Sequence, residues 1–132
     1  MPDAFPLLMD RVAQIAATTP GLELLVLFGS RATGQFHAGS DWDFGYIVTD
    51  EADVSALLGR IVEIVGSDRV DLVDLRSASG LLRYRAACDG RLLFEARPST
   101  WDQLRLDAVR FWCDAAPVLQ RGYDDALADL KR

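Results

Sequence analysis

Apolar residues along this chain follow two arrangements, one with helical spacing and one of short continuous runs. Helical spacing over residues 5–18 and 51–65 predicts two amphipathic helices, because residues three and four apart share one helix face. The short runs are rich in leucine, valine and aromatic residues, which predicts buried strands. These runs cover residues 24–28, 42–48, 69–75 and 91–96.

The second half of the chain predicts further helices. Ser77 is expected to cap a helix that ends near Ala87, and Ser99 is expected to cap the next one. Pro117 should break that helix or open a last helical stretch reaching Leu130, because proline lacks the N–H that a helix interior uses. Helices interleaved with about four strands predict an α/β (α+β) fold, in which helices flank a small mixed sheet.

The composition fits one globular domain over residues 1–132. Hydrophobic residues make up 50% of the chain, which suffices for a core at this length. The formal net charge is −6, so no nucleic-acid partner is expected, because such partners require a basic face. No run approaches the ~18 apolar residues of a membrane-spanning helix, and no basic segment precedes an apolar run at the start. We therefore expect no membrane partner and a cytoplasmic location.

Gly29 and Ser30 come directly after the apolar run 24–28. A glycine allows a ligand to approach the backbone closely, and successive N–H groups at such a turn suit a phosphate. Arg31 follows and is long enough to reach a triphosphate, although a solvated surface arginine is an equally ordinary interpretation. A Gly-Ser pair alone is also common at ordinary strand ends. Its significance therefore depends on the residues that follow.

Asp41 and Asp43 stand two positions apart at the start of the run 42–48, so both are expected on one face of a strand. Two close carboxylates repel each other unless a cation lies between them. Mg²⁺ takes oxygen ligands and is usually held by one or two carboxylates together with substrate phosphates. We expect Gly45, on the same face, to leave space beside the metal. The alternative is a loop aspartate followed by a solvated strand aspartate.

Asp71 and Asp74 lie within another hydrophobic run, where an unpaired carboxylate is unfavourable. Their spacing places them on opposite faces of a strand, so at most one of them converges on the first pair. We favour Asp71 as the third carboxylate because it lies deeper in the strand. Asp74 lies near the strand exit beside Arg76 and is kept as the alternative third ligand.

The run from Gly29 to Gly34, followed by Ser40-Asp41-Trp42-Asp43, resembles the signature of the DNA polymerase β-type nucleotidyltransferase superfamily. Within it, the chain is most similar to the small single-domain members, the minimal nucleotidyltransferases. The segment 70–75 is similar to the one that supplies their third carboxylate. The resemblance implies a polymerase β-type fold. It covers a core of about 22–96 well and C-terminal helices of about 99–130 loosely.

The resemblance also implies a site and a reaction. Asp41, Asp43 and Asp71 would be the catalytic metal ligands and would hold two Mg²⁺ ions. Gly29, Ser30 and Arg31 would bind the phosphates of a nucleoside triphosphate, with ATP as the expected substrate. A hydroxyl would attack the α-phosphate in line, and pyrophosphate would leave.

Small members of this superfamily imply a protein acceptor. They are often antitoxins paired with an all-helical HEPN ribonuclease toxin, and they transfer AMP from ATP to a tyrosine of that toxin in a hetero-oligomeric complex. Aromatic residues toward the end of the chain suit such a partner, although core packing explains them equally well: Trp101, Phe111, Trp112 and Tyr123. The alternatives are a non-catalytic antitoxin that acts by binding, or a nucleotidyltransferase that modifies a small hydroxylated molecule.

Overall fold

A single four-stranded mixed sheet, in the order β3-β2-β1-β4, forms the centre of the molecule. The computed structural model describes residues 4–37 and 39–130. Strand β1 runs antiparallel to both β2 and β4, whereas β3 runs parallel to β2. The strands are β1 (Leu22–Phe28), β2 (Trp42–Val48), β3 (Val70–Asp74) and β4 (Arg91–Glu95). The predicted fold class and the positions of its strands are confirmed.

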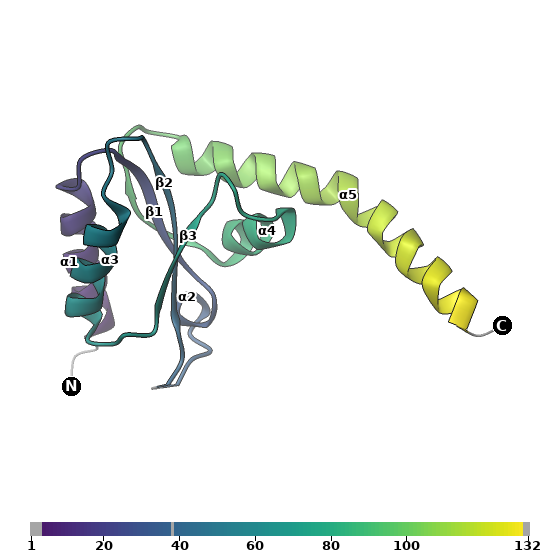
Figure 1. Cartoon of the computed structure of the whole chain (residues 1–132), viewed down its shortest axis with the longest axis horizontal. Helices are drawn as coiled ribbons and strands as arrows, with labels where there is room; N and C mark the ends of the chain where they lie inside the picture. The colour runs from purple at the N-terminus through teal and green to yellow at the C-terminus, as the bar shows by residue number, and fades with distance from the viewer. Residues whose placement is uncertain (1–3, 38, 131–132) are drawn as a thin grey trace.

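Helices cover both faces of the sheet (Figure 1). Helices α1 and α3 lie on one face, and α4 with the first part of α5 lies on the other, while the rest of α5 extends away from the body. Helix α3 forms the crossover that parallel strands β2 and β3 require. The helices are α1 (Phe5–Ala17), α2 (Ser30–Thr33), α3 (Val54–Val65), α4 (Gly80–Asp89) and α5 (Thr100–Leu130).

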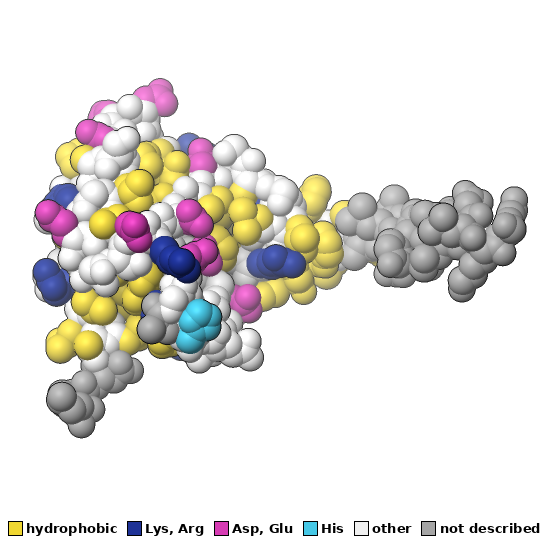
Figure 2. Space-filling view, turned by 60° about the horizontal axis from the view of Figure 1, so that its bottom comes forward, with side chains coloured by type: hydrophobic (Ala, Val, Ile, Leu, Met, Phe, Trp, Pro, Cys, Tyr) yellow, Lys and Arg dark blue, Asp and Glu magenta, His cyan; other side chains and the backbone are white. Residues whose placement is uncertain are grey.

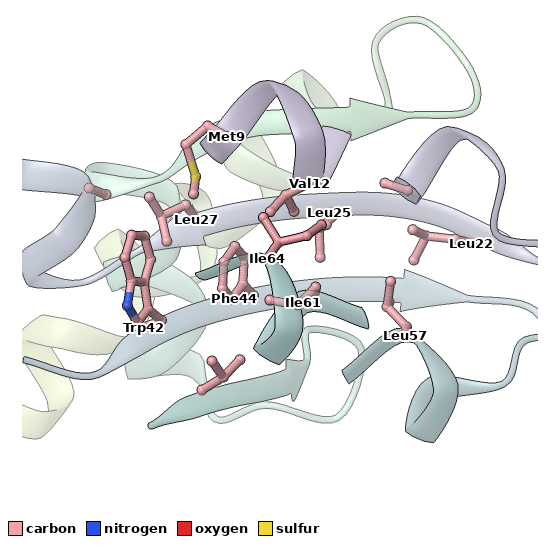
Figure 3. Packing of buried hydrophobic residues seen from close by; sticks show 13 residues of the cluster. Met9, Val12, Leu22, Leu25, Leu27, Trp42, Phe44, Leu57, Ile61 and Ile64 are labelled. Carbon is pink, nitrogen blue, oxygen red and sulfur yellow. The ribbon is translucent and has the colours of Figure 1, made fainter. Parts of the chain in front are cut away.

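Strand β1 is buried on both faces, which explains its uninterrupted apolar run. Leu25 and Leu27 belong to the core beneath α1 and α3, together with Phe44 of β2 (Figure 3). Leu24 and Val26 point to the opposite face, where α4 and α5 cover them. The sheet is therefore the middle of three layers. One hydrophobic core packs against each of its faces.

Two helices begin later than the sequence predicts. Helix α3 starts at Val54 instead of residue 51, because the Asp53 carboxylate accepts the N–H of Ala56 at 3.0 Å and caps the helix there. Helix α4 is capped by Ser79, whose hydroxyl accepts the N–H of Leu82 at 3.2 Å. The expected cap at Ser77 is therefore wrong.

The turn before α4 has a clear physical cause. The backbone N–H of Arg76 donates to the Asp74 carboxylate at 2.9 Å, and its guanidinium pairs with Glu23 of β1 at 2.8 Å. These contacts hold the chain in a turn as it leaves β3, so helical geometry begins only after Ser79. Glu23 is distant in the sequence, and local patterns do not reveal the pair.

Helix α5 runs through Pro117 from Thr100 to Leu130, so the predicted break is wrong. Proline removes one intrahelical hydrogen bond, to the carbonyl of Cys113. Both residues are exposed, so water can hydrate that carbonyl. The second half of α5 slopes more steeply than the first in Figure 1. Among the described residues, no helix is long and apolar enough to cross a bilayer.

Phe44 tests the larger core, because its side chain is fully buried at 0% exposure. We expect Phe44→Ala to lower the free energy of unfolding by about 3–5 kcal/mol through lost burial and a residual cavity. Leu7→Ala is the control, since Leu7 is 64% exposed and should change stability by less than about 0.5 kcal/mol. Urea titrations of both variants measure the difference, and equal losses would contradict this packing.

Candidate active site

Asp43 and Asp71 lie directly opposite each other in the parallel pairing of β2 and β3. Directly paired residues point to the same face of a sheet, so both carboxylates lie on the face that α4 covers. Asp41 immediately precedes β2. Burial raises the pKa of Asp43 above its ordinary 3.8, and the charges of Asp71 and Asp41 raise it further. The three carboxylates are therefore close enough to act on one another electrostatically.

Asp74 lies on the other side of the sheet. It pairs with Tyr46 of β2, and its carboxylate accepts the backbone N–H of Arg76 at 2.9 Å. Burial and then the charge of Asp74 raise the pKa of the Tyr46 hydroxyl. The structure thus brings Asp71 to Asp43 and keeps Asp74 away from it. The role of Asp71 as third metal ligand stays a prediction.

Gly29 joins the end of β1 to α2 in a conformation that favours glycine, with φ 75° and ψ −159°. A Cβ added there would lie 2.6 Å from Oδ2 of Asp43. The missing side chain therefore allows the carboxylate to pack against the turn at which α2 begins with Ser30. The carbonyl of Gly29 accepts the N–H of Ala32 at 3.0 Å, which fixes this turn.

Arg31 lies against the loop that leads into Asp41. Its guanidinium donates to the carbonyl of Ser40 at 3.0 Å. It also lies 4.6 Å from the centre of the Phe36 ring and 4.4 Å from that of Trp42, within cation–π range. These contacts hold the loop that leads into β2, the strand that carries Asp43. Phosphate binding by Arg31 stays a prediction.

The expectation that Gly45 leaves space beside a metal is wrong. Gly45 is buried, and a Cβ added there would lie 2.8 Å from Cδ1 of Leu75. Leu75 follows β3 and belongs to the core beneath α4 and α5. Glycine is needed at this position for close packing, and the open space lies nearer the end of β1.

Asp43, Asp71 and Gly29 open onto a pocket of about 390 Å³, a size typical of small-ligand sites. Helix α4 supplies part of the wall through Leu82, Arg85 and Asp89, which the sequence analysis missed. Their spacing of three and four residues places them on one helix face, and this spacing was the available signal. The remaining lining residues are Phe28, Leu72 and Val73. Another cavity, of about 400 Å³, lies near Glu23 at the opposite end of β1.

The donor chemistry at Asp43 and Asp71 fits Mg²⁺. Both residues offer carboxylate oxygens, and a divalent cation would relieve the repulsion that raises the pKa of Asp43. Within the described part of the chain, no three Asp, Glu, His or Cys side chains are grouped as a complete metal site. Mg²⁺ commonly binds through one or two carboxylates and takes its other ligands from water and substrate phosphates. A carboxylate pair is therefore sufficient for this ion.

A sheet of this topology with paired carboxylates at its edge is typical of nucleotide transfer. Residues 10–99 match the family model described as "Polymerase beta, Nucleotidyltransferase". The match covers more than half of the chain, and the protein belongs to this family of nucleotidyltransferases.

Two curated relatives are both described as "Protein adenylyltransferase MntA". The chain is 36% identical over 99 residues to the one from Aphanizomenon flos-aquae, covering 65% of each chain. It is 40% identical over 78 residues to the one from Shewanella oneidensis, covering 57% of this chain and 55% of that protein. The matches thus span less than two thirds of these relatives.

A solved structure resembles nearly the whole chain. It is described as the crystal structure of a toxin-antitoxin with AMP-PNP, and its TM-score is 0.74 at 26% sequence identity. The superposition covers 90% of this chain and 98% of that one.

Gly29→Ala should weaken binding of magnesium nucleotide, because the added methyl group would displace the Asp43 carboxylate. Gly34→Ala is the matched control: Gly34 also has positive φ, at 82°, but has nothing within 4 Å of an added Cβ. Positive φ should cost either variant roughly 1–2 kcal/mol of stability. Calorimetric titration with magnesium and a non-hydrolysable ATP analogue separates the two. Equal binding losses in both variants would refute the steric role of Gly29.

The raised pKa of Asp43 has a defined effect on stability. The folded state binds the proton of the Asp43 carboxyl more tightly than the unfolded chain does. This protonation therefore contributes its full stabilisation of the folded state below pH 3.8, and the contribution is lost as the pH rises through the raised pKa. Without divalent cations, Asp43→Asn should therefore increase the free energy of unfolding at pH 7, and the gain should shrink toward pH 4. Denaturant titrations in EDTA measure it. Asp74→Asn should show no such gain, and a pH-independent gain would contradict the electrostatic cause.

Proposed function

We propose that this protein is a Mg²⁺-dependent protein adenylyltransferase that acts as an antitoxin. It transfers AMP from ATP to a tyrosine of a HEPN-family toxin with which it forms a complex. The observation that carries the proposal is the pairing of Asp43 with Asp71 beside Gly29, at one pocket of a chain in the nucleotidyltransferase family. The names of the two similar curated proteins support the choice of reaction.

Each residue of the site has a role in the proposed reaction. Mg²⁺ held by Asp41, Asp43 and Asp71 would neutralise the triphosphate and lower the pKa of the acceptor hydroxyl. Gly29 leaves room for the Asp43 carboxylate at the phosphate-binding turn, and Ser30 offers the phosphates its hydroxyl and N–H at the start of α2. Arg31 adds positive charge beside them.

The transfer itself is an in-line displacement. The acceptor oxygen forms a bond to the α-phosphorus, and the bond to the bridging oxygen of pyrophosphate breaks. The hydroxyl proton is released, and pyrophosphate leaves with the electrons of the broken bond. Leu72, Val73 and Leu82 form an apolar part of the pocket wall beside the carboxylates.

Exposed apolar side chains on α4 and α5 support a protein acceptor. Leu81 is 42% exposed, Leu106 44% and Phe111 57%. In Figure 2, hydrophobic side chains are spread over the body, with one group at its right-hand side. Of the aromatic residues expected to meet a partner, Trp101 is instead buried in the core, and the side chain of Tyr123 lies outside the described residues.

We further propose that residues 1–132 form one nucleotidyltransferase domain, with its core in about 22–96 and C-terminal helices in about 99–130. We place the protein in the cytoplasm, where ATP is available.

The decisive experiment combines the protein with its cognate HEPN protein, Mg²⁺ and ATP labelled in the α-phosphate. We expect the label on a tyrosine of the HEPN protein, and an Asp41→Asn, Asp43→Asn double variant should lose at least about 100-fold in rate, because it removes the charges that bind the ions. An Asp74→Asn control should retain the activity, since Asp74 lies on the opposite sheet face.

Neutralisation in cells gives the second result. If the double variant still protects against the toxin, the protein acts by binding and the proposed mechanism is wrong. Labelling of a small hydroxylated molecule in the absence of any protein acceptor would overturn the assignment of the substrate.

A further inference from the structure

Arg85 lines the same pocket as Asp43 and Asp71, but from the opposite wall. Among the described residues the only ion pair joins Arg76 to Glu23, so no carboxylate of the described part neutralises Arg85. Three aspartates line the same pocket, but Arg85 forms an ion pair with none of them. The N–H donors of its guanidinium are therefore available to a ligand. The ligand it favours is an anion.

Helix α4 holds the backbone of Arg85 in place against the sheet and α5. Its neighbours Ala86 and Ala87 are buried, with exposures of 1% and 3%. The carbonyl of Ala87 also accepts a hydrogen bond from Nε of Arg105 on α5, at 3.2 Å. The packed helix fixes the backbone from which Arg85 projects, and the exposed side chain leaves its guanidinium accessible to a ligand.

The acidic lining of the pocket makes such a cation favourable for binding a triphosphate. Asp43, Asp71 and Asp89 are negative, and a nucleoside triphosphate adds further negative charge. Metal ions held by Asp43 and Asp71 would offset this repulsion only on the sheet side of the pocket. A guanidinium presents planar donors that match phosphate oxygens.

Arg31 is placed differently. Its guanidinium donates to the carbonyl of Ser40 and lies over the rings of Phe36 and Trp42, outside the residues that line the pocket. Arg85 is the arginine that lines the pocket itself.

We infer that Arg85 binds phosphate oxygens of the nucleoside triphosphate from the α4 side, opposite the carboxylates. The inference rests on the proposed nucleotidyl transfer and adds a determinant of nucleotide affinity that is independent of the acceptor. Arg85 therefore distinguishes a triphosphate from an uncharged nucleoside.

Equilibrium binding of ATP and of adenosine to the whole chain, with Ca²⁺ in place of Mg²⁺ and no acceptor, tests the inference. We expect Arg85→Ala to weaken ATP binding by about 10- to 100-fold, the loss typical of a charge-assisted hydrogen bond, and to leave adenosine binding unchanged. Arg85→Lys should recover part of the affinity. Arg60→Ala, an exposed arginine of α3 on the other side of the sheet, is the matched charge control and should change neither.

Two results would overturn the inference. Equal losses for ATP and adenosine would show that Arg85 only supports the pocket wall. Unchanged ATP binding, with a raised KM for the acceptor protein, would place Arg85 at the acceptor instead. Failure of the proposed function looks different: ATP binding would depend on Arg85 while no HEPN protein became labelled.

Discussion

The register between β2 and β3 is the constraint on which the site depends. It places two like charges, the half-buried Asp43 and the exposed Asp71, opposite each other on one sheet face, where burial and their repulsion raise the pKa of Asp43. A folded protein tolerates this arrangement only because the surrounding structure is strongly held. Here β1, which is buried on both faces, and the crossover through α3 fix the two strands relative to each other. The stability of the cores thus maintains a local arrangement of like charges that is itself unfavourable.

Much of this could be predicted from the sequence, and the misses have a common cause. Strand positions followed from apolar runs, and the proximity of Gly29 to Asp43 followed from their spacing around a turn. Long-range contacts decided the rest. The choice between Asp71 and Asp74 depends on which strand pairs with β2 and in which direction, and the spacing of the two residues says only that their faces differ. The start of α4 depends on the ion pair of Arg76 with Glu23, 53 residues away.

The pocket wall on α4 illustrates the same limit at the level of function. The spacing of Leu82, Arg85 and Asp89 defines a helix face, but a sequence does not say which way that face points. Local motifs therefore identified the residues that could hold the metal and the phosphates next to β1. The opposite wall became visible only when the packing of α4 against the sheet was known. Where a site combines a local motif with a distant helix, sequence patterns will generally identify the motif residues and miss those on the helix.

Helix α5 gives the molecule a mechanical property. It is tied to the sheet where Glu95 accepts the N–H of Trp101 at 3.0 Å, and it is tied to α4 where Trp112 stacks on Tyr84 with ring centres 5.4 Å apart. The same α4 presents Arg85 to the pocket. Helix α4 therefore forms part of the pocket wall on one side and contacts α5 on the other, whereas Asp43 and Asp71 lie on the sheet. A displacement of α5 and a change in the shape of the pocket thus share one structural element, α4.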